Sequence, residues 1–367
     1  MKSVLENYVI AHWNQLPDPG PVPGRISLLG QATGVSKVCI FIFVDGETSP
    51  RYVVKVPRSP AYNEELMHEV TAVQDLREKV SQTLRATLPG PLHVAQVSDH
   101  WIVVEPVIPG RPMESLIKSD RPLDRGQIAR LMDLAFEWLV SIQLEAMRFR
   151  EPLDAYQIRQ HFLDPMMAAR TVSQLSVEEQ NYLDRQSFVA RELEGHRLPL
   201  NLYHGDFAPG NILLDGSRIA VLDWQFSRRF APPLLDWFRF VFRVYGRAAG
   251  LPDIDGSLDE YRSAFDQVFF ARNWYSGLVS DYTRTYCRIM GIDLEHISLL
   301  FCMFLVSSIV KYQAFLSKRA GRGYLYLLEG IPASDQSFRQ RLRRQAYVWL
   351  LGELAARPSV PLAALVA

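Results

Sequence analysis

Two carboxylates and one carboxamide stand close together near the middle of the sequence: Asp206, Asn211 and Asp223. Phosphoryl transfer needs a group that orients the attacking hydroxyl and groups that hold Mg²⁺ against the nucleotide, because most of the catalysis is positioning and charge neutralisation. Asp206 can accept the proton of the acceptor hydroxyl, while Asn211 and Asp223 offer the hard oxygen ligands that Mg²⁺ prefers. The three residues therefore predict a catalytic base and a magnesium site.

The segment that joins Asn211 to Asp223 predicts a β-hairpin. Two apolar runs, at 212–214 and 219–222, flank the turn signal Asp215-Gly216-Ser217, and such a turn connects antiparallel strands. The hairpin brings Asp223 back beside Asn211, as a shared metal site requires.

The motif resembles that of the aminoglycoside phosphotransferase family, within the wider group of proteins with a protein-kinase-like fold. It consists of His-Gly-Asp at 204–206, four further residues, Asn211, and an apolar strand that ends in Asp223-Trp224. A protein kinase has His-Arg-Asp and Asp-Phe-Gly at the matching places, whereas this chain has Gly205 and Trp224-Gln225. The resemblance implies an α+β, bilobal protein-kinase-like fold, with a small β-rich N-lobe and a large, mainly helical C-lobe, and a small-molecule kinase.

The resemblance also implies structural roles for His204 and Asp236. His204 supports the catalytic loop and leaves the chemistry to Asp206, although a histidine beside Gly-Asp is otherwise a plausible acid or base. Asp236 holds the backbone of the catalytic loop; the alternative is an acidic residue that complements the dipole at the start of a helix.

With 367 residues the chain is long enough for two domains. We expect an N-lobe over residues 1–107, which binds the nucleotide, and a C-lobe over residues 108–367, with the catalytic loop, the metal site and the acceptor site. The N-lobe pattern predicts a helix at 1–16, strands at 26–29, 38–44, 52–56, 94–97 and 101–107, and a helix at 63–79. The C-lobe pattern predicts helices at 113–118, 125–149, 156–170, 177–193, 234–245, 258–290, 296–315 and 337–355.

A turn between the first two strands contains Gly30, Gly34 and Ser36. Glycine lets the backbone approach a ligand closely, so N–H groups of this turn can meet the phosphates of a nucleotide. Two glycines in an ordinary hairpin are the alternative, and the catalytic motif favours the nucleotide site.

Lys55 lies in the third strand among β-branched residues, where an unpaired buried lysine is costly. The resemblance implies that Lys55 holds the α- and β-phosphates and is positioned by a glutamate of the following helix. Helix phase favours Glu69, beside an apolar stripe, over Glu65 one turn earlier. The alternative for Lys55 is an outward-facing side chain on a half-exposed strand.

The last strand of the N-lobe runs into Pro109-Gly110 and resembles the hinge of the family. This likeness implies that main-chain atoms of Glu105 and Val107 pair with the base of ATP or GTP. An ordinary strand that ends at Pro-Gly fits the same residues.

Forty basic and forty acidic residues cancel, so the charge predicts neither a nucleic acid nor an anionic membrane as partner. The three cysteines show no pairing pattern and the first residues show no signal peptide, which favours a cytoplasmic protein. The apolar stretch 297–310 is shorter than the ~20 residues of a membrane span and predicts a buried core helix.

The acceptor is left open by the sequence, but the charges of residues 251–367 bear on its class. This part has eleven acidic and thirteen basic residues, whereas a polycationic aminoglycoside needs carboxylates to balance its charge. Its aromatic residues could stack on a sugar ring or an apolar acceptor, although helical aromatic residues are more often core. They are Phe265, Phe269, Phe270, Trp274, Tyr275, Tyr282 and Tyr286. We expect a neutral or anionic hydroxyl compound.

The sequence as a whole predicts a Mg²⁺-dependent phosphotransferase that moves the γ-phosphate of ATP or GTP to a hydroxyl of a small molecule. The alternative is a catalytically silent, nucleotide-binding regulatory pseudokinase. Such proteins usually lack at least one residue of the set Lys55, Glu69, Asp206, Asn211 and Asp223. All five are present in this chain, which favours catalysis.

Overall fold

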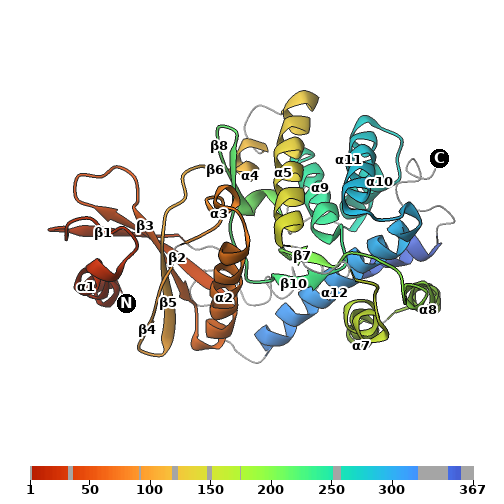
Figure 1. The fold of residues 1–367 in the computed structure, drawn as a ribbon, viewed down its shortest axis with the longest axis horizontal. Helices are drawn as coiled ribbons and strands as arrows, with labels where there is room; N and C mark the ends of the chain where they lie inside the picture. The colour runs from red at the N-terminus through yellow and green to blue at the C-terminus, as the bar shows by residue number, and fades with distance from the viewer. Residues whose placement is uncertain are drawn as a thin grey trace. The chain divides into compact units, whose positions relative to one another are not determined.

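The chain forms two compact units in the computed structural model, which describes residues 2–31, 36–90, 92–117, 123–146, 151–173, 175–250, 258–320 and 346–356. The first unit contains residues up to Arg111 together with Leu213–Phe226; the rest of the described chain belongs to the second unit. The first unit thus extends beyond the predicted N-lobe, 1–107, and includes the strand that leads to Asp223. Figure 1 shows its β-rich composition and the mainly helical second unit.

A five-stranded antiparallel sheet forms the centre of the first unit, in the order β1-β2-β3-β5-β4. Its strands are β1 (Ile26–Gln31), β2 (Lys37–Val44), β3 (Tyr52–Pro57), β4 (His93–Val97) and β5 (His100–Pro106). The helices of this unit are α1 (Lys2–Ala11), α2 (Asn63–Lys79) and α3 (Gln82–Arg85), and a 3₁₀ turn follows α1 at Trp13–Gln15. Five strands with one long inserted helix confirm the predicted N-lobe.

The two faces of this sheet bury different side chains, because successive residues of a strand point to opposite sides. One face packs under α1, with Val54 and Val104 in the same core as Val9 and Trp13. On the other face, Val103 packs with Leu66 and Val70 of α2. Odd-numbered positions of β3 and β5, and positions 37 and 39 of β2, therefore belong to the face that α2 covers.

The predicted hairpin consists of β8 (Ile212–Asp215) and β9 (Arg218–Val221), which join β6 (Arg111–Pro112) in a second sheet of order β6-β8-β9. The backbone enters β6 through Gly110, whose φ of +134° an L side chain rarely adopts. A Cβ at Gly110 would lie 3.0 Å from the carbonyl oxygen of Leu214, so both the conformation and the close approach require glycine.

Helices make up most of the second unit: α4 (Met113–Ile117), α5 (Arg125–Ala146), α6 (Ala155–Ile158), α7 (Asp164–Val172), α8 (Val177–Arg191), α9 (Leu235–Ala248), α10 (Leu258–Phe269), α11 (Trp274–Met290) and α12 (Ile297–Ala320). A further helix covers Ala346–Ala356; the remaining part of the predicted helix 337–355 lies outside the described residues. The predicted helix 156–170 contains a π-helical turn at Arg159–Leu163 between α6 and α7. The pair β7 (Asn201–Tyr203) and β10 (Arg228–Ala231) is not predicted by the sequence, because both strands are very short.

The single helix predicted for 258–290 is wrong, since the chain breaks between α10 and α11. Asn273 adopts an extended conformation there, and its Oδ1 accepts hydrogen bonds from the N–H groups of Tyr275 at 2.8 Å and Ser276 at 2.9 Å. A side chain that satisfies these first amides starts a new helix. The apolar periodicity continues through the break, so the sequence pattern predicts one helix instead of two.

The core of the second unit forms around α12, which packs on α7, α8 and α9. The stretch Leu294–Tyr312 is long and apolar enough to cross a membrane by length and composition, but 67% of its best window is buried within the structure. Four aromatic residues of α10 and α11 are also buried, namely Phe265, Phe269, Tyr275 and Tyr286, whereas Trp274 is 37% exposed. These four aromatic side chains therefore belong to the hydrophobic core, which was the alternative to stacking on an acceptor.

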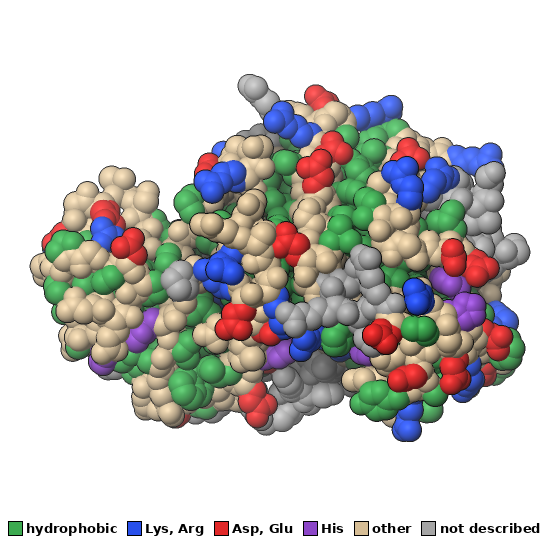
Figure 2. Space-filling model, in the orientation of Figure 1, with side chains coloured by type: hydrophobic (Ala, Val, Ile, Leu, Met, Phe, Trp, Pro, Cys, Tyr) green, Lys and Arg blue, Asp and Glu red, His purple; other side chains and the backbone are tan. Residues whose placement is uncertain are grey.

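Charged side chains of both signs are interspersed on the face drawn in Figure 2. This distribution matches the equal numbers of basic and acidic residues in the sequence.

Candidate active site

The catalytic loop of the second unit is fixed by Asp236, near the start of α9. The N–H groups of His204 and Gly205 donate to the two carboxylate oxygens of Asp236 at 2.7 Å and 3.0 Å. Gly205 has a φ of +81°, which glycine adopts without strain. Asp236 is 2% exposed, and burial raises its pKa. The geometry is that of a carboxylate that holds the loop backbone.

His204 is buried, and its ring contributes to the shape of the loop. Its Nδ1 atom accepts a hydrogen bond from the N–H group of Asp206 at 3.1 Å, and its ring packs edge-on against Phe207. These contacts support a structural role for His204.

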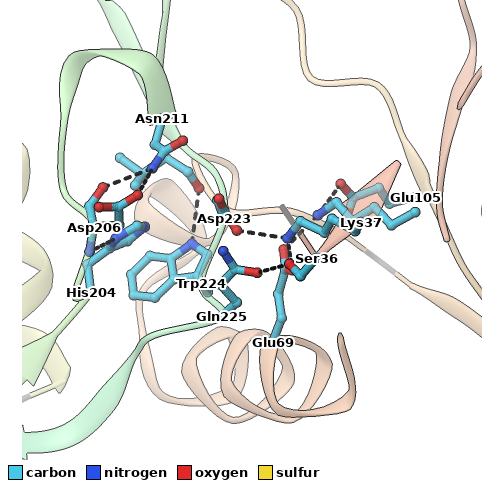
Figure 3. A network of polar contacts seen from close by, with 12 residues as sticks. Ser36, Lys37, Glu69, Glu105, His204, Asp206, Asn211, Asp223, Trp224 and Gln225 are labelled. Atoms are coloured by element: carbon cyan, nitrogen blue, oxygen red, sulfur yellow. Dashed lines mark hydrogen bonds and ion pairs between the residues drawn. The ribbon is translucent and has the colours of Figure 1, made fainter. Parts of the chain in front are cut away.

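The Asp206 carboxylate is half-buried and has a hydrogen-bond donor at each oxygen. Asn211 Nδ2 donates to Oδ2 at 3.1 Å, and Lys311 Nζ donates to Oδ1 at 2.7 Å (Figure 3 shows the contact with Asn211). Burial by itself would raise the pKa of Asp206, but Lys311 and Arg239 outweigh it and lower that pKa. Asp206 is therefore held in one orientation and in the ionised form.

Three cations near Asp206 were not predicted from the sequence: Arg239 and Arg243 of α9, and Lys311 of α12. Arg239 is 1% exposed and donates to Ser308 Oγ at 3.1 Å, while its Nε and Nη1 atoms have no hydrogen-bond partner among the described residues. Burial lowers the pKa of Lys311 despite the nearby Asp206. Arginines at four-residue spacing in a helix rich in apolar and aromatic residues were the available signal, since buried charges need a partner.

A cavity of about 410 Å³ also lies in the second unit. Tyr203, Arg228 and Ser307 are among its lining residues, but Asp206 is not. The cavity is therefore not assigned as the acceptor site.

In the first unit, Lys55 of β3 lies between two carboxylates. Its Nζ atom is 2.8 Å from Glu69 Oε1 and 2.8 Å from Glu105 Oε1. Of the two candidate glutamates of α2, Glu69 is the one in this ion pair. The side chain of Glu105 thus pairs with Lys55, whereas the sequence analysis expects only main-chain atoms of Glu105 to act, by pairing with the nucleotide base.

Val107 lies just beyond β5, and its N–H group donates to the carbonyl oxygen of Arg51 at 3.0 Å. The predicted contact of Val107 with the nucleotide base therefore depends on its carbonyl oxygen.

Lys37, at the start of β2, is a second buried lysine that the sequence reasoning missed. It donates to Glu69 Oε2 and, at 2.7 Å, to Asp223 Oδ1 (Figure 3). Asp223 has a φ of +67°, a strained conformation for an aspartate and one that is typical of functional sites. A lysine directly before an apolar run was the only sequence signal.

The predicted phosphate-binding turn is described only in part. Gly30 lies in β1, and Gly34 lies outside the described residues. Ser36 is buried, and its hydroxyl donates to Gln225 Oε1 at 3.0 Å, two residues after Asp223 (Figure 3).

A lysine–glutamate pair between a sheet and its helix is a feature of the kinases that share the protein-kinase-like fold. The chain belongs to the phosphotransferase enzyme family APH, whose model matches residues 40–275, more than half of its length. This membership confirms the resemblance stated from the motif.

Solved structures are similar to this chain. An amicoumacin kinase in complex with AMP-PNP and Ca²⁺ has a TM-score of 0.50 and 11% identity, with 94% of this chain and 92% of that chain covered. A choline/ethanolamine kinase family protein from Mesorhizobium loti has a TM-score of 0.46 and 15% identity, with coverages of 96% and 95%. A spectinomycin phosphotransferase in complex with ADP and spectinomycin has a TM-score of 0.46 and 12% identity, with coverages of 96% and 98%. Among curated protein sequences there is no match.

We expect Asp236→Ala to lower the free energy of unfolding by about 3 kcal/mol, because hydrogen bonds to a charged group are lost and two buried amides are left without acceptors. Urea unfolding followed by circular dichroism measures the change. Asp281→Ala, at an aspartate of α11 whose side chain is 75% exposed, is the control and should change stability little. Equal effects of the two substitutions would contradict the role of Asp236.

Proposed function

We propose that this protein transfers the γ-phosphoryl group of ATP or GTP to a hydroxyl group of a small molecule and requires Mg²⁺. The family membership supports a phosphotransferase. The observation that carries the proposal is the state of Asp206, a half-buried carboxylate held by Asn211 and Lys311 and kept ionised by its neighbours.

Asp206 orients the acceptor hydroxyl in this proposal. The lowered pKa makes Asp206 a weak base, so it accepts a hydrogen bond from the hydroxyl first and takes the proton as the new oxygen–phosphorus bond forms. Such timing suits phosphoryl transfer, whose transition state has little bonding to the attacking oxygen. Orientation by Asp206 therefore contributes more than its basicity.

The donor set fits Mg²⁺. Asn211 Nδ2 donates to the main-chain oxygen of Asp206 at 2.9 Å as well as to its carboxylate, which leaves the amide oxygen Oδ1 as the atom to bind a cation. Asp223 supplies a carboxylate, and Mg²⁺ prefers such oxygen ligands. When bound, Mg²⁺ would neutralise charge on the β- and γ-phosphates.

The charges around Asp206 support an acceptor that is neutral or anionic. Lys311 contacts Asp206, and the positive charges of Arg239 and Arg243 also act on it. A polycation would face these three cations and would have to give up its hydration without enough carboxylates in exchange. This local argument agrees with the slight excess of basic residues in 251–367.

Asp206→Asn should lower kcat by about two to four orders of magnitude and leave nucleotide affinity almost unchanged, because Asp206 acts mainly in the transition state. A nucleotide-consumption screen against sugars, amino alcohols, nucleosides and antibiotics first identifies an acceptor, and steady-state kinetics then compare the variants. Asp215→Asn, at the exposed last residue of β8, is the matched control. Full activity of Asp206→Asn would overturn the assignment, and a wild type that binds nucleotide without turnover would favour the pseudokinase.

Asp223→Ala should abolish the Mg²⁺-dependent part of nucleotide binding, because a coordinating carboxylate is lost. Isothermal titration of AMP-PNP and GMP-PNP, with Mg²⁺ and with EDTA, measures this part directly. Asp215→Ala should keep the response to Mg²⁺. An Asp223→Ala protein that binds nucleotide more tightly with Mg²⁺, as the wild type is expected to do, shows that Asp223 is not a metal ligand.

Expression in an aminoglycoside-sensitive bacterium should give little or no resistance to kanamycin, because the cations around Asp206 disfavour a polycationic acceptor. The minimal inhibitory concentration is compared between cells with the wild type and cells with Asp206→Asn. Strong resistance that requires Asp206 would refute the charge argument and would direct attention to the acidic residues Asp253, Asp255, Asp259 and Glu260.

A further inference from the structure

The cavity of about 410 Å³ in the second unit is large enough for a small organic molecule. Its walls come from the π-helical turn Arg159–Leu163 and the start of α7, from the paired strands β7 and β10 (Figure 1), and from α9 and α12. Asp206 and Asn211 are not among the residues that line it. A molecule in this cavity is therefore bound apart from the proposed catalytic base and metal ligand.

The charged side chains that line the cavity belong to two adjacent arginines of β10, Arg228 and Arg229. Successive residues of a strand normally point to opposite sides. Here the pairing of β10 with β7 changes register between Arg228 and Ala231, and such an irregularity redirects side chains. Both guanidinium groups are exposed, and in the described part of the chain neither forms an ion pair. The described lining contains no aspartate or glutamate, so the charge of the two arginines is not balanced within the cavity.

Neutral polar groups lie beside these arginines. Tyr203 is the cross-strand partner of Arg228, and its hydroxyl oxygen accepts a hydrogen bond from Arg239 at 3.5 Å, which leaves its own proton to be donated. Burial and the charge of Arg228 lower the pKa of His161, so its ring is neutral at pH 7 and can donate one hydrogen bond. The hydroxyl of Ser307 in α12 adds another donor to the lining. The cavity thus combines two cations with several neutral donors.

We propose that this cavity binds an organic anion, a small molecule with a carboxylate or a phosphate monoester on an apolar body, in addition to the nucleotide and the acceptor. Arg228 and Arg229 would hold the anionic group, since the planar guanidinium matches the geometry of both kinds of anion. Pro232 and Leu235 give the lining an apolar part for the rest of the molecule. The occupant would contact β7, the strand that leads directly into the catalytic loop.

The test measures binding of two simple anions, benzoate and phenyl phosphate, to the full chain by saturation-transfer NMR, with benzyl alcohol as the neutral analogue. We expect both anions to bind the wild type more tightly than benzyl alcohol does. The double variant Arg228→Gln/Arg229→Gln should weaken anion binding by roughly ten- to a hundredfold, because charge-assisted hydrogen bonds are lost. Arg288→Gln, at an exposed arginine of α11, changes the charge elsewhere and should leave the affinities unchanged.

A second variant, Ser307→Phe, fills the cavity without a change of charge and should abolish binding of both anions. Melting curves followed by circular dichroism establish that each variant is folded; if Ser307→Phe is not, the double variant decides alone. Binding of only one anion to the wild type would support the site and identify its preferred head group. Binding of neither anion, binding of benzyl alcohol as tight as that of the anions, or unchanged affinities in the double variant would overturn the proposal. No nucleotide or turnover enters this experiment, so its result is independent of the proposed function.

Discussion

The ion pairs of the Glu69 carboxylate are the interaction on which the face of the first sheet covered by α2 depends. Glu69 is 3% exposed and contacts both Lys37 and Lys55, so one helix side chain holds two strands. Burial by itself would raise the pKa of Glu69, but the two lysines outweigh it and lower that pKa. Removing one member of such a cluster leaves uncompensated charge in the interior. The position of α2 on the sheet is therefore tied to the state of the ion pairs.

The second unit uses the opposite balance of charge. One carboxylate, Asp206, lies among several cations, whereas the first unit surrounds two lysines with carboxylates. Asp236 adds a purely structural carboxylate that accepts two main-chain amides. Both arrangements keep the functional group charged in a partly desolvated place, and both use neighbours from distant parts of the chain to do so. Such preorganisation is what phosphoryl transfer requires from a protein.

Local patterns were sufficient to predict the strands of the first unit, the bounds of α2, the hairpin and the motif that identifies the family. Periodicity and turn residues determine these features over a few positions. The residues that were missed depend on contacts between distant segments: Lys37 and Asp223 are separated by 186 positions, and Lys311 and Asp206 by 105. A lysine at the start of an apolar strand or within an apolar helix gives no sign of its partner. The helix break at Asn273 was missed for a different reason, because one capping side chain outweighed a continuous apolar pattern.

The path of the backbone has a consequence for how this protein can be divided. Within the part of the chain that the structure describes, the first unit is assembled from two separate stretches, and the stretch 213–226 that bears Asp223 continues into the second unit at both of its ends. An amino-terminal fragment cut after Arg111 would contain Lys37, Lys55 and Glu69 but not Asp223. A graft that is meant to move this ion-pair cluster between relatives must therefore exchange two segments at once, and natural recombination at a single crossover would separate Lys37 from the Asp223 carboxylate that it contacts.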